Sequence, residues 1–232
     1  MQTIGIIGAM EEEVAALRQK GEQITAKTIG FMDFYMITLS GKQLVVVQSG
    51  IGKVNAAICA QLLIDRFGVD AVINVGVAGG LADGIHIGDI VVSKSVQEWD
   101  MDASALGDPA GTIPRMEVSI FPADETLVRL ALDSAKVLEG KQVLEGHIVS
   151  GDKFVASDQE KQYLKKQFHG DCVEMEGAAV GHTCYVNKVP FVILRSISDA
   201  ADDHGSMSYE DFKAVAIENS LKVLEKMIED MQ

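Results

Sequence analysis

Short runs rich in Val and Ile alternate with longer segments of helical periodicity along almost the whole chain. Such alternation is typical of α/β folds, in which strands of one sheet are connected by helices that cover it. The sequence predicts strands at residues 3–7, 43–48, 71–75, 89–93, 146–150 and 190–194. It predicts helices at about residues 11–20, 54–67, 125–139, 159–168, 176–186 and 209–231.

Several of these strands are apolar at consecutive positions, as in "FVIL" at residues 191–194. Continuous apolar runs are typical of strands that are covered on both faces. The chain contains no internal repeat, low-complexity tract or linker that would divide it. We therefore expect a single α/β domain over residues 1–232, with a central mixed, mostly parallel twisted sheet flanked by helices.

The formal net charge of the chain is −14 at pH 7. Binding to nucleic acid or to an anionic membrane depends on clustered Lys and Arg side chains, which this balance disfavours. We therefore expect a small-molecule partner, no nucleic acid and no membrane.

The cysteines and the amino-terminal residues bear on the cellular compartment. Cys59, Cys172 and Cys184 form no CxxC pair and leave one thiol over, so we expect neither a disulfide framework nor a zinc site. The opening "MQTIGIIGAMEEEV" lacks a basic region, and no apolar run approaches the roughly 20 residues that span a bilayer. We expect a cytoplasmic protein.

The segments that follow the predicted strands are rich in glycine and in carboxylates. They read "GAMEEE", "SGIGK", "GVAGGLADG", "GDKF" and "RSISD" in chain order. Because open α/β sheets bind ligands at the carboxyl ends of their strands, these segments are the candidate site. The glycine loops lack the spacing of a phosphate-binding loop or a dinucleotide fingerprint. They either provide accessible backbone amides to a ligand or only permit tight turns.

Carboxylates in two of these segments, and in "CVEMEGAA" at residues 172–179, could have structural or catalytic roles. Glu11, Glu12 and Glu13 begin a predicted helix, where acidic side chains interact favourably with the helix dipole, yet one could face a ligand. Glu174 and Glu176 could share one face of an extended chain, or instead cap the helix that follows or form a salt bridge. Of the three aspartates after the 190–194 strand, only Asp199 is near enough to the strand end to belong with the other loops, whereas Asp202 and Asp203 are expected in a solvated turn.

Taken together, these segments resemble those of the 5'-methylthioadenosine/S-adenosylhomocysteine nucleosidases, within the nucleoside phosphorylase superfamily. The resemblance spans nearly the whole chain and is carried by "IGIIGAMEEEV" (4–14), "SGIGKVNAA" (49–57), "NVGVAGGL" (74–81), "GDIVVS" (88–93), "VSGDKF" (149–154), "VEMEGAA" (173–179) and "LRSISDAAD" (194–202). It implies a nucleoside phosphorylase-like fold and hydrolysis of the N-glycosidic bond of an adenine nucleoside that carries a 5'-thioether.

The resemblance also implies roles for individual residues. Asp199, oriented by Ser198, would protonate the adenine leaving group at N7, and Glu13 would activate water with help from Arg195. Glu176 would bind the ribose hydroxyls and stabilise positive charge on the sugar. No metal or cofactor takes part.

The remaining contacts that the resemblance implies are largely apolar. Phe154 would stack on adenine, whose edge the Val155 backbone would bind, and Met175 would pack on the ribose beside Ala78 and Gly79. The group on the 5' carbon would lie against Met10, Ile51 and Tyr209. Each methionine and aromatic could equally be ordinary core packing.

The longest irregular segment, residues 99–125, holds three of the four prolines of the chain. Loops of this length in a compact domain usually carry a function. The resemblance implies a homodimer in which residues 101–115 of a neighbouring subunit, with Ala103, Leu106 and Pro114, close the pocket. Leu106 stands where relatives often have an aromatic and Val77 where some have Ser, so we expect substrate preference to shift and one water contact, but not the reaction, to be affected.

Two alternatives remain from the residues. A phosphorolytic nucleoside phosphorylase of the same fold needs cations for phosphate, but this chain has "GAMEEE" where many such enzymes have a Gly-Asp-Pro motif with Arg, and a carboxylate there repels phosphate. A non-catalytic nucleoside-binding protein would lack one of the carboxylates at 13, 176 and 199, and all three are present. Hydrolysis is the favoured prediction.

Overall fold

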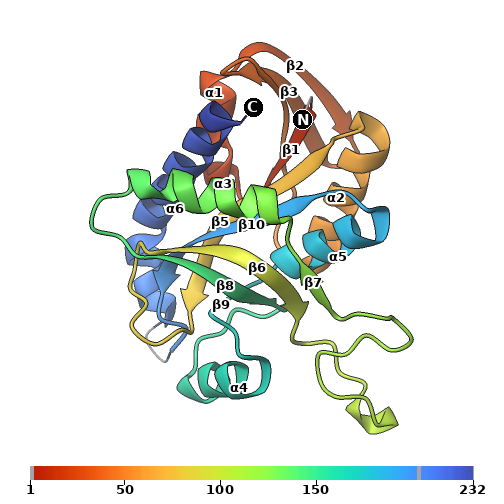
Figure 1. The fold of residues 1–232 in the computed structure, drawn as a ribbon, viewed down its shortest axis with the longest axis vertical. Helices are drawn as coiled ribbons and strands as arrows, with labels where there is room; N and C mark the ends of the chain where they lie inside the picture. Colours follow the sequence, from red (N-terminus) through yellow and green to blue (C-terminus); the bar gives the residue numbers. More distant parts are fainter. Residues whose placement is uncertain (1–2, 203–204, 232) are drawn as a thin grey trace.

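The computed structural model describes residues 3–202 and 205–231, which form a large sheet covered by helices (Figure 1). The strands are β1 (Thr3–Gly8), β2 (Glu22–Ile29), β3 (Met32–Leu39), β4 (Lys42–Gln48), β5 (Ala71–Gly80), β6 (Ile90–Glu98), β7 (Ile120–Pro122), β8 (Val143–Ser150), β9 (Cys172–Glu174) and β10 (Phe191–Asp199). The helices are α1 (Ala15–Lys20), α2 (Lys53–Phe67), α3 (Glu125–Ser134), α4 (Asp158–Phe168), α5 (Gly177–Asn187) and α6 (Gly205–Asp230), with 3-10 turns η1 (Glu11–Glu13), η2 (Ser104–Leu106) and η3 (Ala135–Val137). The predicted α/β class is confirmed.

The strand order is β10-β6-β8-β9-β5-β1-β4-β3-β2, with β7 paired to β6. An additional pairing between β10 and β5 closes the strands β10, β6, β8, β9 and β5 into a ring. The sheet is mixed as predicted, but it is not mostly parallel. Parallel pairings join β1 to β4 and β5, β5 to β10, and β8 to β6 and β9, while antiparallel pairings are as numerous.

The antiparallel part contains strands that the sequence did not predict. Tight turns at Gly30 and Gly41, both with positive φ, connect β2, β3 and β4, and connections this short join only antiparallel strands. β2 is an edge strand whose residues are nearly all exposed, so it carries no apolar run. An apolar pattern therefore could not reveal it.

Strands of the ring are longer than predicted. β5 extends to Gly80, β6 to Glu98 and β10 to Asp199. A register shift between Ile197 and Asp199 bends β10 against β5. Segments that the sequence assigned to loops are thus strand residues, held in place by backbone hydrogen bonds.

Alternate residues of the central strands contribute to two cores on opposite faces of the sheet. In β10, Val192 and Leu194 pack in the core with α3 and α6, whereas Phe191 and Ile193 pack in the core with α2 and α5. Successive side chains of a strand point to opposite faces, so a strand covered twice must be apolar throughout. In Figure 1, α3 and α6 cover one face and α2 and α5 the other.

The predicted helices are present with small changes at their ends. The segment predicted as one helix at 11–20 is divided at Val14 into η1 and α1, since Val14 has a non-helical φ of −126°. The helix predicted at 125–139 ends at Ser134 and continues as the single turn η3.

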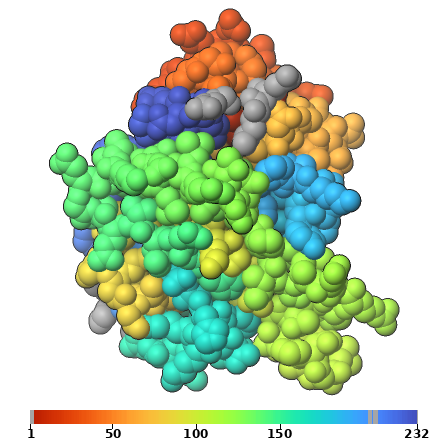
Figure 2. Space-filling model, in the orientation of Figure 1, coloured from red at the N-terminus to blue at the C-terminus, as the bar shows by residue number. Residues whose placement is uncertain are grey.

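Residues 99–119, between β6 and β7, contain η2 and several turns and project from the body of the molecule (Figures 1 and 2). Leu106 at its tip is 84% exposed. Within the described part of the chain, no helix is both long enough and apolar enough to span a membrane.

Close packing of α5 against the sheet depends on Gly181. A Cβ atom there would lie 2.5 Å from Cγ2 of Val96 and 2.9 Å from Cε2 of Phe191. We expect Gly181→Ala to lower the free energy of unfolding by about 1–3 kcal/mol, because the core must shift to accept the methyl group. Urea denaturation measures the change. Lys166→Ala, at an exposed position of α4, is the control and should change it by less than about 0.5 kcal/mol; equal effects would contradict the packing argument.

Candidate active site

A cavity of about 350 Å³ lies where β1, β5, β8, β9 and β10 end. Its lining includes many residues that the sequence analysis selected: Met10, Glu13, Ile51, Ala78, Gly79, Phe154, Val155, Met175, Glu176, Ser198, Asp199 and Tyr209. The lining also includes Ala9, Val77, Lys153, Val173 and Glu174. Segments from the two halves of the chain therefore meet at one concave site.

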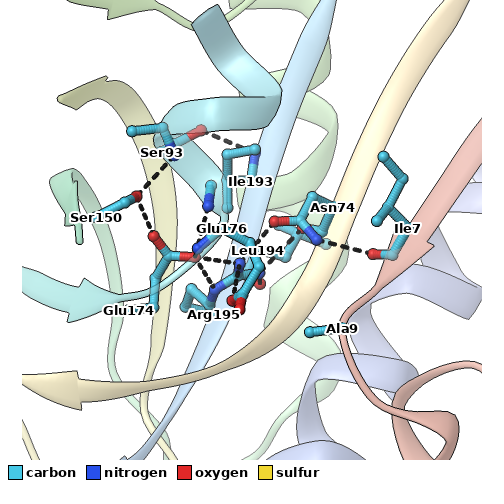
Figure 3. Close-up of polar contacts among 12 residues, drawn as sticks. Ile7, Ala9, Asn74, Ser93, Ser150, Glu174, Glu176, Ile193, Leu194 and Arg195 are labelled. Atoms are coloured by element: carbon cyan, nitrogen blue, oxygen red, sulfur yellow. Dashed lines mark hydrogen bonds and ion pairs between the residues drawn. The ribbon is translucent and has the colours of Figure 1, made fainter. Parts of the chain in front are cut away.

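Beneath the cavity, Arg195 and Glu174 form a buried ion pair (Figure 3). The Arg195 guanidinium, 1% exposed, donates to the Glu174 carboxylate through Nε and Nη2 and to Oδ1 of Asn74 at 2.6 Å. The Nη1 group donates to the Leu194 carbonyl at 3.1 Å. These bonds engage the guanidinium from several sides, and Arg195 is not among the described residues that line the cavity.

Glu174 connects Arg195 to the start of α5. Its carboxylate accepts hydrogen bonds from the backbone N–H groups of Glu176 at 3.1 Å and Gly177 at 2.7 Å, and from the Ser150 hydroxyl. A salt bridge was one of the structural roles expected for Glu174, but no sequence pattern indicated that its partner would be Arg195.

Glu13 is the one buried carboxylate of the "EEE" run, because η1 turns Glu11 and Glu12 outward. Its Oε2 atom accepts from the backbone N–H groups of Ala9 at 2.7 Å and Met10 at 3.0 Å. Burial raises the pKa of Glu13, although these bonds and the charge of Arg195 lower it. The Glu13 carboxyl group therefore keeps its proton to a higher pH than the same group does in water.

Asp199 is the last residue of β10 and is 2% exposed. Its Oδ2 atom accepts from the Ser198 hydroxyl at 2.9 Å and its Oδ1 atom from the Ala201 N–H at 2.8 Å. A Cβ at position 79 would lie 2.9 Å from Oδ1, so Gly79 leaves room for the carboxyl group. Burial raises the pKa of Asp199.

Glu176 occupies the N-cap position of α5 and is 7% exposed. Its Oε1 atom accepts from the Gly52 N–H at 2.8 Å, and its Oε2 atom lies 3.9 Å from Nη2 of Arg195. Burial, followed by the nearby charge of Glu174, raises the pKa of Glu176 to about 7. One arginine thus faces more carboxylates than it can neutralise.

Aromatic and thioether groups form an apolar part of the wall. The rings of Phe154 and Tyr209 meet edge to face with centroids 5.6 Å apart, and the Tyr209 hydroxyl lies 3.4 Å from Sδ of Met10. Phe154 is 43% and Ile51 57% exposed at the cavity mouth. Large apolar groups left open at a cavity are suited to contact a ligand or a second protein chain.

Other selected residues lie away from this cavity. Leu106 and Pro114 are exposed in the projecting segment, and neither is among the described lining residues. Asp202 is half-buried, and Asp203 lies outside the described residues. Among residues 3–202 and 205–231, no three His, Cys, Asp or Glu side chains are grouped as metal ligands would be.

The raised pKa of Glu176 predicts how stability depends on pH. Its stabilising contribution is fully present below about pH 4.5, the ordinary value, and is lost as the pH rises through about 7. Relative to the parent, Glu176→Gln should therefore gain up to about 3 kcal/mol of unfolding free energy between pH 4.5 and pH 8. Urea denaturation at both pH values measures this gain. The exposed control Glu12→Gln should show none; an identical difference at both pH values for Glu176→Gln would contradict the prediction.

Comparison with known proteins places this site in a family. Residues 3–229 match the phosphorylase superfamily model. The 5'-methylthioadenosine/S-adenosylhomocysteine nucleosidase of Staphylococcus aureus is 40% identical over 231 residues, covering 98% of this chain and all of that protein.

Solved structures agree with this relationship. The nucleosidase of the same name from Neisseria meningitidis, in complex with methylthio-immucillin-A, superposes with a TM-score of 0.95 at 38% identity over the full length of both chains. An aspartate-to-asparagine mutant of the Helicobacter pylori enzyme, with 5'-methylthioadenosine in the active site, gives 0.94 at 35% identity, again over both full lengths. The chain therefore belongs to the phosphorylase superfamily and, within it, to the 5'-methylthioadenosine/S-adenosylhomocysteine nucleosidases.

Proposed function

We propose that this chain, as a single domain over residues 1–232, hydrolyses the N-glycosidic bond of 5'-methylthioadenosine and S-adenosylhomocysteine, and also of 5'-deoxyadenosine. The products are adenine and the corresponding 5'-substituted ribose. The observation that carries the proposal is that Glu13, Glu176 and Asp199, all at least nine-tenths buried, line one largely apolar cavity. The reaction needs an acid, a base and a group that stabilises positive charge on the sugar, and these carboxyl groups can supply all three.

Asp199 is proposed as the acid. Adenine leaves poorly as an anion, so a proton must reach N7 as the bond to the sugar breaks. Burial raises the pKa of Asp199, which keeps the proton on the carboxyl group closer to neutral pH than in water. The Helicobacter pylori relative with an aspartate replaced by asparagine holds 5'-methylthioadenosine in its active site, as expected where the replaced group is needed for the reaction and not for binding.

Glu13 is proposed as the base that deprotonates the attacking water. Its Oε2 atom is held by two backbone N–H groups, so the carboxylate has a fixed direction. Arg195 is proposed to order the water indirectly, because its own donors are engaged with Glu174 and Asn74 while its charge acts on Glu13. Val77, which also lines the cavity, offers this water no hydroxyl.

Glu176 is proposed to bind the ribose hydroxyls. The transition state resembles an oxocarbenium ion, and a carboxylate at the sugar stabilises its positive charge. The Gly52 N–H fixes one oxygen of Glu176. Met175, which also lines the cavity, would pack against the ribose.

The apolar walls are proposed to hold the two ends of the nucleoside. Phe154 would stack on adenine, and the Val155 backbone would bind its edge beside Ala78 and Gly79, all of which line the cavity. Met10, Ile51 and Tyr209 would contact the group on the 5' carbon. Ser198 would orient the acid through its hydrogen bond to Asp199.

A homodimer is proposed to complete the pocket. Ile51, Val54, Ile58 and Val186 form an exposed apolar surface on α2, α5 and the loop before α2, beside the cavity mouth. Burial of such a surface favours association. The projecting segment at 101–115 has the reach to contribute Leu106 and Pro114 to a neighbouring subunit, which is what the family resemblance implies.

Phosphorolysis is the less favoured alternative. Glu13, Glu174 and Glu176 would repel a phosphate ion, whereas Arg195 is already paired. Lys153 lines the cavity, but its ammonium group binds the Glu160 carboxylate. The proposed setting is the cytoplasm, where release of adenine and a thioribose would serve methionine salvage.

The proposed hydrolysis should need no phosphate. Purified protein incubated with 5'-methylthioadenosine in phosphate-free buffer should release adenine, because water is the proposed nucleophile. Chromatography or a coupled absorbance assay measures the release, and added phosphate should leave the rate unchanged. A rate that depends on phosphate would contradict hydrolysis.

The proposed acid and base can each be tested by a conservative substitution. Glu13→Gln and Asp199→Asn keep the shape of each side chain but remove its proton transfer, so each should lower kcat by about 10²- to 10⁴-fold. Steady-state kinetics with 5'-methylthioadenosine measures this. Glu12→Gln, next to Glu13 but exposed, is the matched control and should retain the parent rate. Near-parental turnover in either variant would remove that residue from its role.

A further inference from the structure

Lys161, on the first turns of α4, reaches across to the segment that follows β10. Its ammonium group donates a hydrogen bond to the Ala200 carbonyl at 2.6 Å. The side chain is half-buried between the two segments. α4 itself contributes nothing to the cavity lining among the described residues, so a role for this helix is not evident from the cavity alone.

The Ala200 carbonyl belongs to the same peptide group as the Ala201 N–H, which donates to Oδ1 of Asp199 at 2.8 Å. A peptide group is planar and its C=O and N–H point in opposite directions. When an ammonium group fixes the oxygen on one side, it also fixes the direction of the N–H on the other. A single rigid unit therefore connects Lys161 to the Asp199 carboxyl group.

The backbone conformation of this turn is unusual and closely packed. Ala201 has a φ of +50°, in the left-handed region that residues other than glycine rarely adopt, and it is fully buried. A Cβ at position 79 would lie 2.8 Å from the Cβ of Ala201. Left-handed backbone is unfavourable for a residue with a Cβ, so the turn needs contacts such as the Lys161 bond to hold it.

We propose that Lys161 is a positioning residue for the acid of the reaction, acting through the Ala200–Ala201 peptide group. It directs the Ala201 N–H at Oδ1 of Asp199 and so leaves Oδ2, which Ser198 contacts, on the side of the purine. Chains of hydrogen bonds also polarise one another, so the ammonium group strengthens the N–H as a donor. This inference depends on the proposed function of Asp199.

The charges around Asp199 are consistent with this arrangement. Burial raises its pKa, and the charge of Asp202, on the segment after β10, raises it further. The Ala201 N–H, the Ser198 hydroxyl and the charge of Lys161 lower it. From α6, Tyr209 lines the same cavity as Asp199, and burial raises the pKa of its phenol to about 12, so it is neutral at working pH. Lys161 is the one cation among these described groups.

The test is the pH dependence of kcat in Lys161→Met. An acid must be protonated to act, so kcat falls as the pH rises through the pKa of Asp199. Without Lys161, the carboxylate is less stabilised and this alkaline limb should move to higher pH by about half a unit or more. The plateau should fall about tenfold, with KM changed less than about twofold, because the acid is misdirected while the apolar walls stay.

Two further variants separate positioning from general effects. Lys165→Met lies one turn later on α4, where its ammonium group pairs with the exposed Asp83. It should reproduce the parent profile. Lys161→Arg keeps a cationic donor and should return the alkaline limb to the parental pH. An unshifted limb in Lys161→Met, an equal shift in Lys165→Met, or no recovery in Lys161→Arg would each overturn the proposal.

The outcome is distinguishable from failure of the proposed function. If Asp199→Asn retained near-parental turnover, Asp199 would not be the acid, whatever the Lys161 variants did. If Asp199→Asn is inactive and the Lys161→Met profile superposes on that of the parent, the acid assignment stands and only the positioning role is wrong. A lower melting temperature alone, without a shifted limb, would likewise assign Lys161 to stability only.

Discussion

Arg195 lies in the middle of β10 with its guanidinium buried against the Glu174 carboxylate and the Asn74 side chain. Removing two charges from water costs several kcal/mol for each ion, and such a pair persists only when its remaining donors and acceptors are satisfied. Here they are, by the Ser150 hydroxyl, by backbone N–H groups at the start of α5 and by the Leu194 carbonyl. The pair thus joins β10, β5, β8 and the start of α5 under the cavity. The charge of Arg195 also acts on Glu176, whose Oε2 lies 3.9 Å from Nη2, and lowers the pKa of Glu13 against the larger effect of burial.

The closed ring of strands explains why this pair can form. β10 pairs with β5 on one side and β6 on the other, and β8 and β9 complete the circuit. Closure brings the ends of β5, β9 and β10 to one place, so Ala78, Glu174 and Asp199 line one cavity although they are far apart in sequence. Burial in this apolar setting raises the pKa of Glu13, Glu176 and Asp199, which is the condition for acid and base chemistry near neutral pH.

Much of the sheet and of the candidate site could be predicted from local pattern. Apolar runs located β1, β4, β5, β6, β8 and β10, and Asp199 was identified by its place after the last of them, whereas Glu13 and Glu176 were singled out only by the family resemblance. β2 was missed because its side chains are exposed, and β9 because three residues carry no periodicity. The sheet is not mostly parallel as predicted, because the strands that were not predicted, β2, β3, β7 and β9, bring antiparallel pairings. Leu106 and Pro114 depend on a neighbouring subunit, so their role stays a prediction.

The sequence by itself determined the class of fold, the order of six strands and of the helices along the chain, the family and the carboxylates to examine, because periodicity and motif spacing are local properties. Only the tertiary structure decided that Glu13 faces inward while Glu11 and Glu12 do not, that Glu174 pairs with Arg195, and that Lys161 contacts the peptide group beside Asp199. Each of these depends on the burial of one particular side chain or on a contact between segments far apart in the chain. Burial of one side chain and contact between distant segments are not set by neighbouring residues in the sequence. Both arise when the ring of strands closes and the two cores exclude water from the strand ends.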